Sequence, residues 1–306
     1  MPDPIIDKLI PMLDPKMGGK TILLFGDSGD GKSTLLGELA EHLYGYGKAP
    51  DGKPLRTRVY TADYGGTDVL TPYIKMGITE IVNLAGRPAP WEWMNAVAMG
   101  KKLNNLGQWI PGVDPDIGMY AFEGMTSFAN AMLVALGGEG GNLALKPSQG
   151  GDKDSHGRNY GLTQIRTGEN VKLSFALPGV KFWTALARRG DDADTTQTIL
   201  GPQVVGKALT SEVPAWFNFT FRIMSLPADE MMKTPERHRL CITDYVDQTA
   251  RGAKGLGNSR RPLDGGELPA FVEPASLVQA LYLIDKASGT AEASIRARLV
   301  KAGVLK

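Results

Sequence analysis

The chain has 306 residues, of which 42% are hydrophobic and 22% are charged, which is enough for one large domain or two modest ones. Its 34 lysines and arginines nearly balance 33 aspartates and glutamates, so composition gives no global attraction to nucleic acid or to an acidic membrane surface. The single cysteine, Cys241, excludes an internal disulfide and favours the reducing cytoplasm, and no charge-free apolar run reaches the roughly 18 residues of a membrane span.

The first part of the chain predicts an alternation of strands and helices. After a lead-in over residues 1–18, an apolar run of strand length covers residues 21–25. Apolar residues at spacings of three and four then predict an amphipathic helix over residues 33–43, and a second strand is expected at residues 57–62. Strand, glycine loop, helix and strand in this order indicate the βαβ unit of a parallel sheet.

The middle of the chain is less regular. Residues 91–106 are expected to be helical, and a strand at residues 117–122 leads into a helix at residues 126–136. A stretch rich in Gly, Ser, Lys and Asp predicts a long mobile loop over residues 137–157. Residues 162–176 are then expected to form another helix.

The last part of the chain predicts the far edge of the sheet. Strands are expected at residues 180–185, 213–224 and 240–245, and residues 188–206 are expected to be a polar loop. Helical material closes the chain over residues 274–305.

The chain has no internal repeat and no clear linker. We therefore expect one core domain over residues 19–250, preceded by the lead-in of residues 1–18. Residues 251–306 are expected to add a basic, Gly-rich segment and C-terminal helices.

Glycine is unusually frequent, with 38 of 306 residues, and one cluster of glycines stands between the first predicted strand and helix. The sequence GDSGDGKS, from Gly26 to Ser33, matches the pattern G-x-x-x-x-G-K-S completely. Backbone N–H groups of such a loop can surround a phosphate, so we expect Lys32 to reach the β and γ phosphates of a nucleotide and the Ser33 hydroxyl to bind Mg²⁺. The predicted nucleotide-binding residues are Gly26, Asp27, Ser28, Gly29, Asp30, Gly31, Lys32, Ser33 and Thr34.

Two predicted strands end in a carboxylate, the second in Asp63 and the third in Glu123. Because ligands of parallel α/β sheets bind outside the carboxyl ends of the strands, both acids should face the same crevice as the glycine loop. Hydrolysis of a nucleotide there needs a carboxylate near Mg²⁺ and a group that orients the attacking water. The alternative is structural, with Asp63 capping a turn and Glu123 capping a helix.

The order of these parts resembles that of the RecA-like ATPases: a Walker A loop, a strand ending in an acid, a Walker B strand, and a strand leading into a polar loop. The resemblance implies an α/β, RecA-like P-loop NTPase fold with a mostly parallel central sheet flanked by helices and a C-terminal helical appendage. It also implies that Asp63 is the water-activating base and Glu123 the Walker B acid that holds the metal with Ser33. Asp stands here where Glu is common, and Glu where Asp is common, so the division of roles stays open.

Later segments extend the resemblance. Residues 182–189 look like the sensor strand of the family, on which Thr184 or Arg188 would sense the γ-phosphate. Residues 201–210 are similar to the segment that closes the second DNA-binding loop of such proteins. The likeness is strongest to the phage-encoded RecA-like AAA-type ATPases, a group that includes single-strand annealing and recombination ATPases.

This resemblance implies a Mg²⁺-dependent ATPase that forms a homo-oligomeric ring or filament and acts on single-stranded DNA in phage recombination or replication, in the host cytoplasm. Lys254, Arg260 and Arg261 are candidates for a finger donated to the nucleotide of a neighbouring subunit, and a solvated basic surface is the alternative. A different function fits the same loop. In that case a nucleotide-gated assembly or regulatory protein controls a protein partner without binding DNA.

Overall fold

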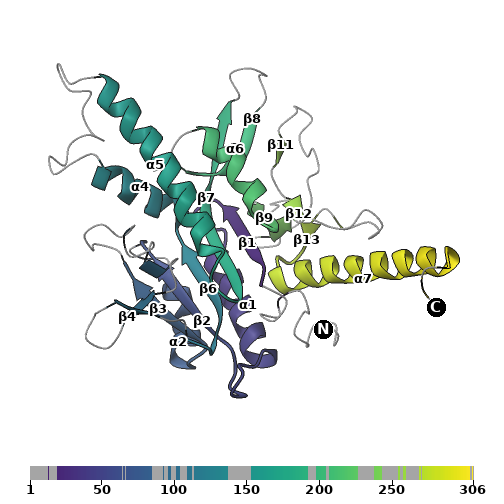
Figure 1. The fold of residues 1–306 in the computed structure, drawn as a ribbon. Helices are drawn as coiled ribbons and strands as arrows, with labels where there is room; N and C mark the ends of the chain where they lie inside the picture. Colours follow the sequence, from purple (N-terminus) through teal and green to yellow (C-terminus); the bar gives the residue numbers. More distant parts are fainter. Residues whose placement is uncertain are drawn as a thin grey trace, which may run out of the picture.

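A mostly parallel β-sheet forms the centre of the protein (Figure 1). The computed structural model describes residues 13, 19–63, 65, 67–84, 92, 96–97, 101–103, 109–111, 114–136, 153–191, 198–204, 207–226, 238–242, 254–255, 258–259, 269, 271–303 and 305. The strands are β1 (Thr21–Gly26), β2 (Arg56–Thr61), β3 (Thr79–Asn83), β4 (Lys101–Leu103), β5 (Trp109–Pro111), β6 (Ile117–Glu123), β7 (Val180–Asp191), β8 (Thr198–Pro202), β9 (Phe219–Leu226), β10 (His238–Ile242), β11 (Lys254–Gly255), β12 (Asn258–Ser259) and β13 (Phe271–Val272).

The strand order across the main sheet is β13-β10-β9-β1-β7-β6-β2-β3. Neighbours from β9 to β3 pair in parallel, whereas β10 pairs antiparallel with β9 and β13 pairs antiparallel with β10. β1 therefore lies in the interior of the sheet, with β7 between it and β6. The short strands β4 and β5 form a separate antiparallel pair.

Helices cover both faces of this sheet. They are α1 (Lys32–Tyr46), the 3₁₀ helix η3 (Asp68–Leu70), α2 (Thr71–Lys75), α4 (Met125–Leu136), α5 (Lys153–Ser174), α6 (Lys207–Trp216) and α7 (Leu277–Lys301). Alternate residues of β1 enter two different cores: Ile22 packs in a cluster with α1 and α7, and Leu23 packs in a cluster with α4, α5 and α6. This burial on both faces is typical of a parallel sheet. The predicted α/β architecture, a mostly parallel central sheet flanked by helices with a helix at the C-terminus, is confirmed.

Several predicted elements differ from the structure in the second half of the chain. The expected polar loop over residues 188–206 contains the end of β7 and all of β8, which pair antiparallel. The expected strand over residues 213–224 begins too early, because residues 213–216 belong to α6, where Val213 is buried with Leu209 four residues earlier. Sheet pairing and helix packing override the local pattern at these positions.

Three further differences lie in the middle of the chain. Residues 101–103, expected to be helical, form β4 and pair with β5. The expected loop over residues 137–157 gives way to α5 from residue 153, and its remainder lies outside the described residues. The buried positions of α5 include the polar residues Thr163, Thr167 and Ser174. Apolar residues therefore do not recur clearly at helical spacing in this segment of the sequence. The prediction also missed β3, which pairs in parallel with β2.

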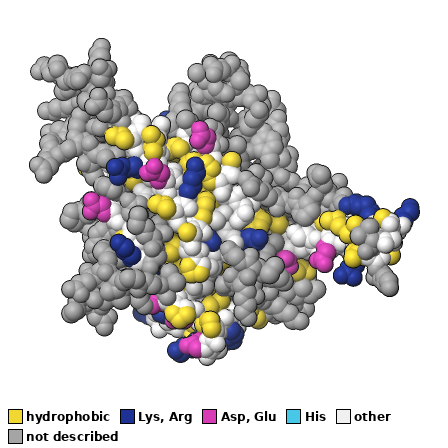
Figure 2. Space-filling view, viewed as in Figure 1, with side chains coloured by type: hydrophobic (Ala, Val, Ile, Leu, Met, Phe, Trp, Pro, Cys, Tyr) yellow, Lys and Arg dark blue, Asp and Glu magenta, His cyan; other side chains and the backbone are white. Residues whose placement is uncertain are grey.

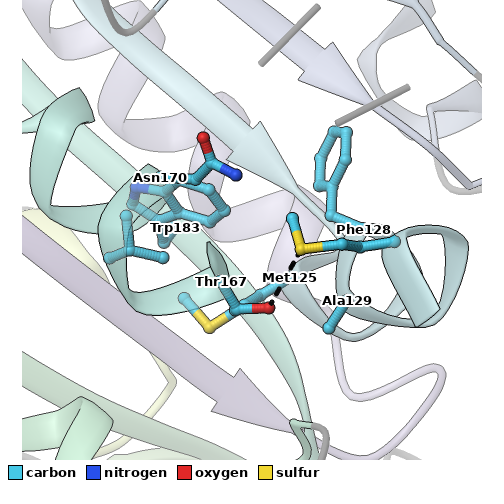
Figure 3. A pocket seen from close by; sticks show the side chains of 8 residues that line it. Met125, Phe128, Ala129, Thr167, Asn170 and Trp183 are labelled. Atoms are coloured by element: carbon cyan, nitrogen blue, oxygen red, sulfur yellow. Dashed lines mark hydrogen bonds between the residues drawn. The ribbon is translucent and has the colours of Figure 1, made fainter. Parts of the chain in front are cut away.

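A small cavity lies between α4, α5 and β7 (Figure 3). Met125, Phe128 and Trp183 give it an apolar lining, and the Thr167 hydroxyl donates a hydrogen bond to the Met132 sulfur at 3.9 Å. Its volume of about 20 Å³ is enough for one water molecule. This cavity is too small for a nucleotide.

Helix α7 extends away from the body of the molecule (Figure 1). Its first half is buried against the sheet, and Ser276 caps its N-terminus by accepting a hydrogen bond from the Gln279 N–H at 3.1 Å. The Ser276 hydroxyl also donates to the Glu38 carboxylate on α1, which accepts a second bond from the Leu277 N–H at 3.0 Å. These bonds join the helix that follows the glycine loop to the start of α7.

We expect Ser276→Ala to lower the free energy of unfolding by about 1 kcal/mol, because an N-terminal N–H of α7 loses its acceptor. Urea denaturation followed by circular dichroism measures this change. Ser288→Ala is the matched control, since the Ser288 hydroxyl only donates to the Ile284 carbonyl within the same helix. An equal loss of stability in both variants would contradict the capping role.

The surface of the described residues carries mixed charges. On the face shown in Figure 2, basic and acidic side chains are interspersed among hydrophobic ones. Among the helices described, none combines the length and the apolar character needed to cross a bilayer.

Candidate functional site

The glycine loop joins the carboxyl end of β1 to the start of α1. Gly29 and Gly31 adopt φ values of 83° and 102°, in the left-handed region that side chains with a Cβ rarely enter. The Lys32 ammonium group donates to the carbonyls of Gly26, at 3.0 Å, and Asp27, at 2.8 Å. Burial is the main cause that lowers the pKa of Lys32, and the surrounding carboxylates oppose it. The Lys32 side chain therefore binds the backbone at the start of its own loop.

Asp30 has a structural position within this loop. Its carboxylate is buried and accepts hydrogen bonds from the Asp27 N–H at 2.8 Å and from the Ser225 N–H at 3.3 Å. These bonds fasten the loop to β9. Gly26, Asp27 and Asp30, all predicted to bind nucleotide, do not line the pocket above the loop.

A pocket of about 520 Å³ opens over the glycine loop. This volume lies in the range typical of small-molecule sites. The predicted nucleotide-binding residues that line it are Ser28, Gly29, Gly31, Lys32, Ser33 and Thr34. Asp63, Glu123 and Thr184 line the same pocket. The tertiary structure therefore brings together the loop, both strand-end acids and one of the two predicted sensor residues.

Glu123 lies beside the end of the glycine loop. The Ser33 hydroxyl donates a hydrogen bond to Glu123 Oε1, while Glu123 Oε2 is buried and has no hydrogen-bond partner among the described residues. The pKa of Glu123 is raised to about 6, mainly because the carboxyl is buried; the Ser33 hydrogen bond and the charge of Lys32 oppose this rise, and the negative charge of Asp63 adds to it. An unsatisfied carboxylate oxygen next to a serine hydroxyl is a donor set that suits Mg²⁺, which usually takes one or two protein oxygens together with phosphate and water.

Asp63 contacts the helix that follows β6. Its Oδ1 accepts a hydrogen bond from the Ser127 hydroxyl on α4, and its own N–H donates to Thr61 Oγ1 at 3.0 Å. Gly124, with φ of 89°, lies beneath it, and a Cβ at Gly124 would approach Asp63 Oδ2 to 2.6 Å. Gly124 therefore leaves the space that the Asp63 carboxylate occupies.

The other predicted site residues have different positions. Thr184 Oγ1 accepts a hydrogen bond from the Gly124 N–H at 2.9 Å. Arg188 lies further along β7, opposite Gly201 of β8, and is not among the residues that line the pocket. Lys254 is described only by its backbone, in β11, and the predicted fingers Arg260 and Arg261 lie outside the described residues.

Ser127 and Arg239 are among the pocket residues that sequence reasoning missed. Ser127 could have been found from its place in the first turn after Glu123, where a hydroxyl can reach a neighbouring strand end. Arg239 also lines the pocket, although it lies on β10, far along the chain from the glycine loop. No local pattern marks it, because only the pairing of β10 with β9 brings it there.

The raised pKa of Glu123 predicts a pH-dependent stability in the absence of metal. Below the ordinary value of 4.5 the carboxyl is protonated in both the folded and the unfolded state, whereas above about 6 it is ionised in both. The folded protein therefore loses stability as the pH rises between these values. We expect Glu123→Gln to be more stable than the wild type at pH 8 by about 1–2 kcal/mol in free energy of unfolding. This advantage should be smaller at pH 4.5.

Urea denaturation in EDTA at both pH values measures this difference. The matched control is Glu292→Gln, which removes an exposed carboxyl on α7 and should leave the pH dependence of stability unchanged. A wild type more stable than Glu123→Gln at pH 8 would contradict the burial argument.

No family model and no curated protein matches this sequence. Among solved structures, the chain is similar to the flagellar accessory protein FlaH from Methanocaldococcus jannaschii, with 9% identity and a TM-score of 0.35, over 73% of this chain and 77% of that one. It is also similar to the RadB recombinase, with 11% identity and a TM-score of 0.41, over 78% of this chain and 87% of that one. The functional interpretation of the pocket therefore rests on the geometry of this chain.

Proposed function

We propose that the protein is a Mg²⁺-dependent nucleoside triphosphatase of the RecA-like type, with ATP as its substrate. The contact between the Ser33 hydroxyl and the Glu123 carboxylate carries this proposal. It joins the last residue of the phosphate-loop motif to the acid that ends β6, inside a pocket large enough for a nucleotide. A binding loop with a metal-ligating serine and a separate carboxylate is the arrangement that phosphoryl transfer requires.

The strand order supports the RecA-like assignment. β7 lies between the loop strand β1 and the strand β6 that ends in Glu123, and β2, which leads to Asp63, lies beyond β6. Glu123 and Asp63 thus approach the loop from the same side of β1. Thr184, in the first half of β7 and paired in register with Leu24 of β1, lies between them and the loop strand.

Ser33 and Glu123 would hold Mg²⁺ in this site. The ion, when bound, would neutralise charge on the β and γ phosphates. In the described conformation the Ser33 hydroxyl donates a hydrogen bond to Glu123, so ligation requires the hydroxyl to turn its oxygen toward the metal. Lys32 would exchange its two backbone carbonyl partners for phosphate oxygens, which bind an ammonium group more strongly than neutral carbonyls do.

Asp63 is the group proposed to orient the attacking water. The Ser127 hydroxyl fixes one carboxylate oxygen of Asp63, and the other lies above Gly124 at the pocket wall. A water that donates a hydrogen bond to this second oxygen would attack the γ-phosphorus, the bond to the β-phosphate oxygen would break, and ADP and phosphate would leave. Asp63 would accept the proton that the water loses.

Phosphate release from ATP, with Mg²⁺ or with EDTA, tests this function directly. We expect turnover with Mg²⁺ and none with EDTA, and a protein that binds ATP and Mg²⁺ without releasing phosphate would overturn the proposal. GTP in the same assay tests the choice of ATP, which rests on the sequence resemblance.

From the sequence resemblance we propose that the protein forms a homo-oligomer and that its ATPase activity acts on single-stranded DNA. The alternative is a nucleotide-gated protein that controls a protein partner. Adding single-stranded DNA to the ATPase assay, with the mass of the oligomer measured in parallel, separates the two. Stimulation by DNA supports the first function, whereas absence of DNA binding with ATP at low salt favours the second.

A further inference from the structure

Arg239 extends from β10 over the start of α1. Its backbone pairs with Ser225 of β9, and its carbonyl accepts a hydrogen bond from the Ala275 N–H at 2.8 Å. Cys241, two residues later, is buried in the core that contains α1. Because side chains two apart on a strand share a face, Arg239 extends to the same side of the sheet.

The guanidinium group lies directly above Gly31. A Cβ placed on Gly31 would lie 3.0 Å from Nη1 and 3.4 Å from Cζ of Arg239. Gly31 precedes α1, whose N-terminus carries partial positive charge from its unpaired N–H groups. The guanidinium cation and the positive end of the helix repel each other when no anion is present. This arrangement therefore favours binding of an anion that contacts the guanidinium group and the N-terminus of α1.

The guanidinium group also retains an unused donor. Arg239 Nε is buried and has no hydrogen-bond partner among the described residues. A buried charged donor without an acceptor is destabilising, and Arg239 lines the same pocket as Lys32 and Ser33. An anionic ligand in that pocket would meet the terminal nitrogen Nη1, which lies over Gly31, and its negative charge would offset the cost of the buried guanidinium group.

Arg239 approaches the pocket from the flank opposite the two carboxylates. β10 and β9 lie on one side of β1, and β7, β6 and β2 lie on the other. The γ-phosphate should lie toward Glu123 and Asp63, where the metal and the attacking water are proposed. A group above Gly31, on the other flank, should therefore meet phosphates that are not transferred.

We propose that Arg239 binds the non-transferred phosphates of the nucleotide, within the same chain that supplies the glycine loop. This inference rests on the proposed function and assigns Arg239 to nucleotide affinity and not to the chemical step. It also differs from the predicted finger residues, which would act on a neighbouring subunit. Arginine suits this role because its planar group offers several donors to phosphate oxygens.

Equilibrium binding of fluorescent ADP and of a non-hydrolysable ATP analogue tests the inference. We expect Arg239→Gln to weaken both nucleotides by about 10- to 100-fold, the loss expected when a charge-assisted hydrogen bond is removed. Arg239→Lys, which keeps the charge, should recover part of the affinity. Arg296→Gln removes an exposed arginine on α7 and should bind both nucleotides as the wild type does.

Four results would overturn the inference. The first is wild-type affinity in Arg239→Gln. The second is a loss confined to the triphosphate analogue or to the turnover number, which would assign Arg239 to the transferred phosphate. The third is an equal loss for adenosine, which has no phosphates. The fourth is a loss of nucleotide affinity in both Arg239 variants that is fully explained by a lower unfolding midpoint, because Arg239 would then have a structural role.

The same experiment separates this inference from the proposed function. A wild-type protein that binds neither nucleotide overturns both. A wild type that binds both, with an unchanged Arg239→Gln variant, overturns only the role of Arg239. Binding that depends on Arg239, without any phosphate release from ATP, overturns hydrolysis and leaves the role of Arg239 supported.

Discussion

Lys32→Ala should lower the turnover number for ATP by about 10³-fold or more, because the transferred phosphate loses its only P-loop cation. The variant should still fold. Lys32 donates only to carbonyls within its own loop, and burial already disfavours its charged form. Steady-state phosphate release, with the unfolding midpoint measured on the same samples, provides both readouts.

The control for this prediction is Lys75→Ala, which removes an exposed lysine at the end of α2. It should hydrolyse ATP at the wild-type rate. Hydrolysis by Lys32→Ala at the wild-type rate would show that the glycine loop does not bind the reacting phosphates. Arg188→Ala is a second comparison, because Arg188 does not line the pocket. This variant should keep the wild-type turnover number, and a loss would mean that Arg188 reaches the nucleotide in a different conformation of the protein.

Asp63→Asn and Glu123→Gln should both reduce turnover, but they should differ in their dependence on Mg²⁺. Asp63→Asn removes the proposed base and should lower the turnover number by about 10²- to 10⁴-fold, at an unchanged half-saturating concentration of Mg²⁺. Glu123→Gln removes the proposed metal acid and should raise that concentration. Titrating Mg²⁺ at saturating ATP measures both quantities.

Ser127→Ala is the matched control for the role of Asp63. It leaves the carboxylate in place and removes only the hydroxyl that donates to it, so turnover should fall less than in Asp63→Asn. If Asp63→Asn instead raised the Mg²⁺ requirement while Glu123→Gln did not, the two roles would be reversed. That outcome is the alternative that the sequence leaves open.

The elements that local sequence predicted well are those with a strong local pattern. The strand before the glycine loop is fully buried, and the helix after it repeats apolar residues at helical spacing, so both appear close to their predicted bounds. The strand β8 escaped prediction because its partner is the extended end of β7, and pairing of that kind leaves little trace in either segment alone.

Sequence by itself was enough to predict a phosphate-binding loop, since that proposed role depends on consecutive backbone groups, one lysine and one serine. It also predicted that Asp63 and Glu123 lie in one crevice with the loop, because the ends of parallel strands meet at one edge of a sheet, and both line the pocket with Lys32 and Ser33. Which acid adjoins Ser33 was decided by the order of β7, β6 and β2 across the sheet. That order depends on which strands pair, and such pairing involves residues far apart in the chain.

Two further features were decided only by the tertiary structure. Asp30 reads as part of the phosphate loop, yet its carboxylate accepts a bond from Ser225 and fastens the loop to β9. Arg239 carries no signal in its own strand, yet it lies above Gly31. Both depend on the pairing of β9 with β1, and Arg239 also depends on the pairing of β10 with β9. This strand order follows from burial of apolar side chains on both faces of the sheet and not from any motif.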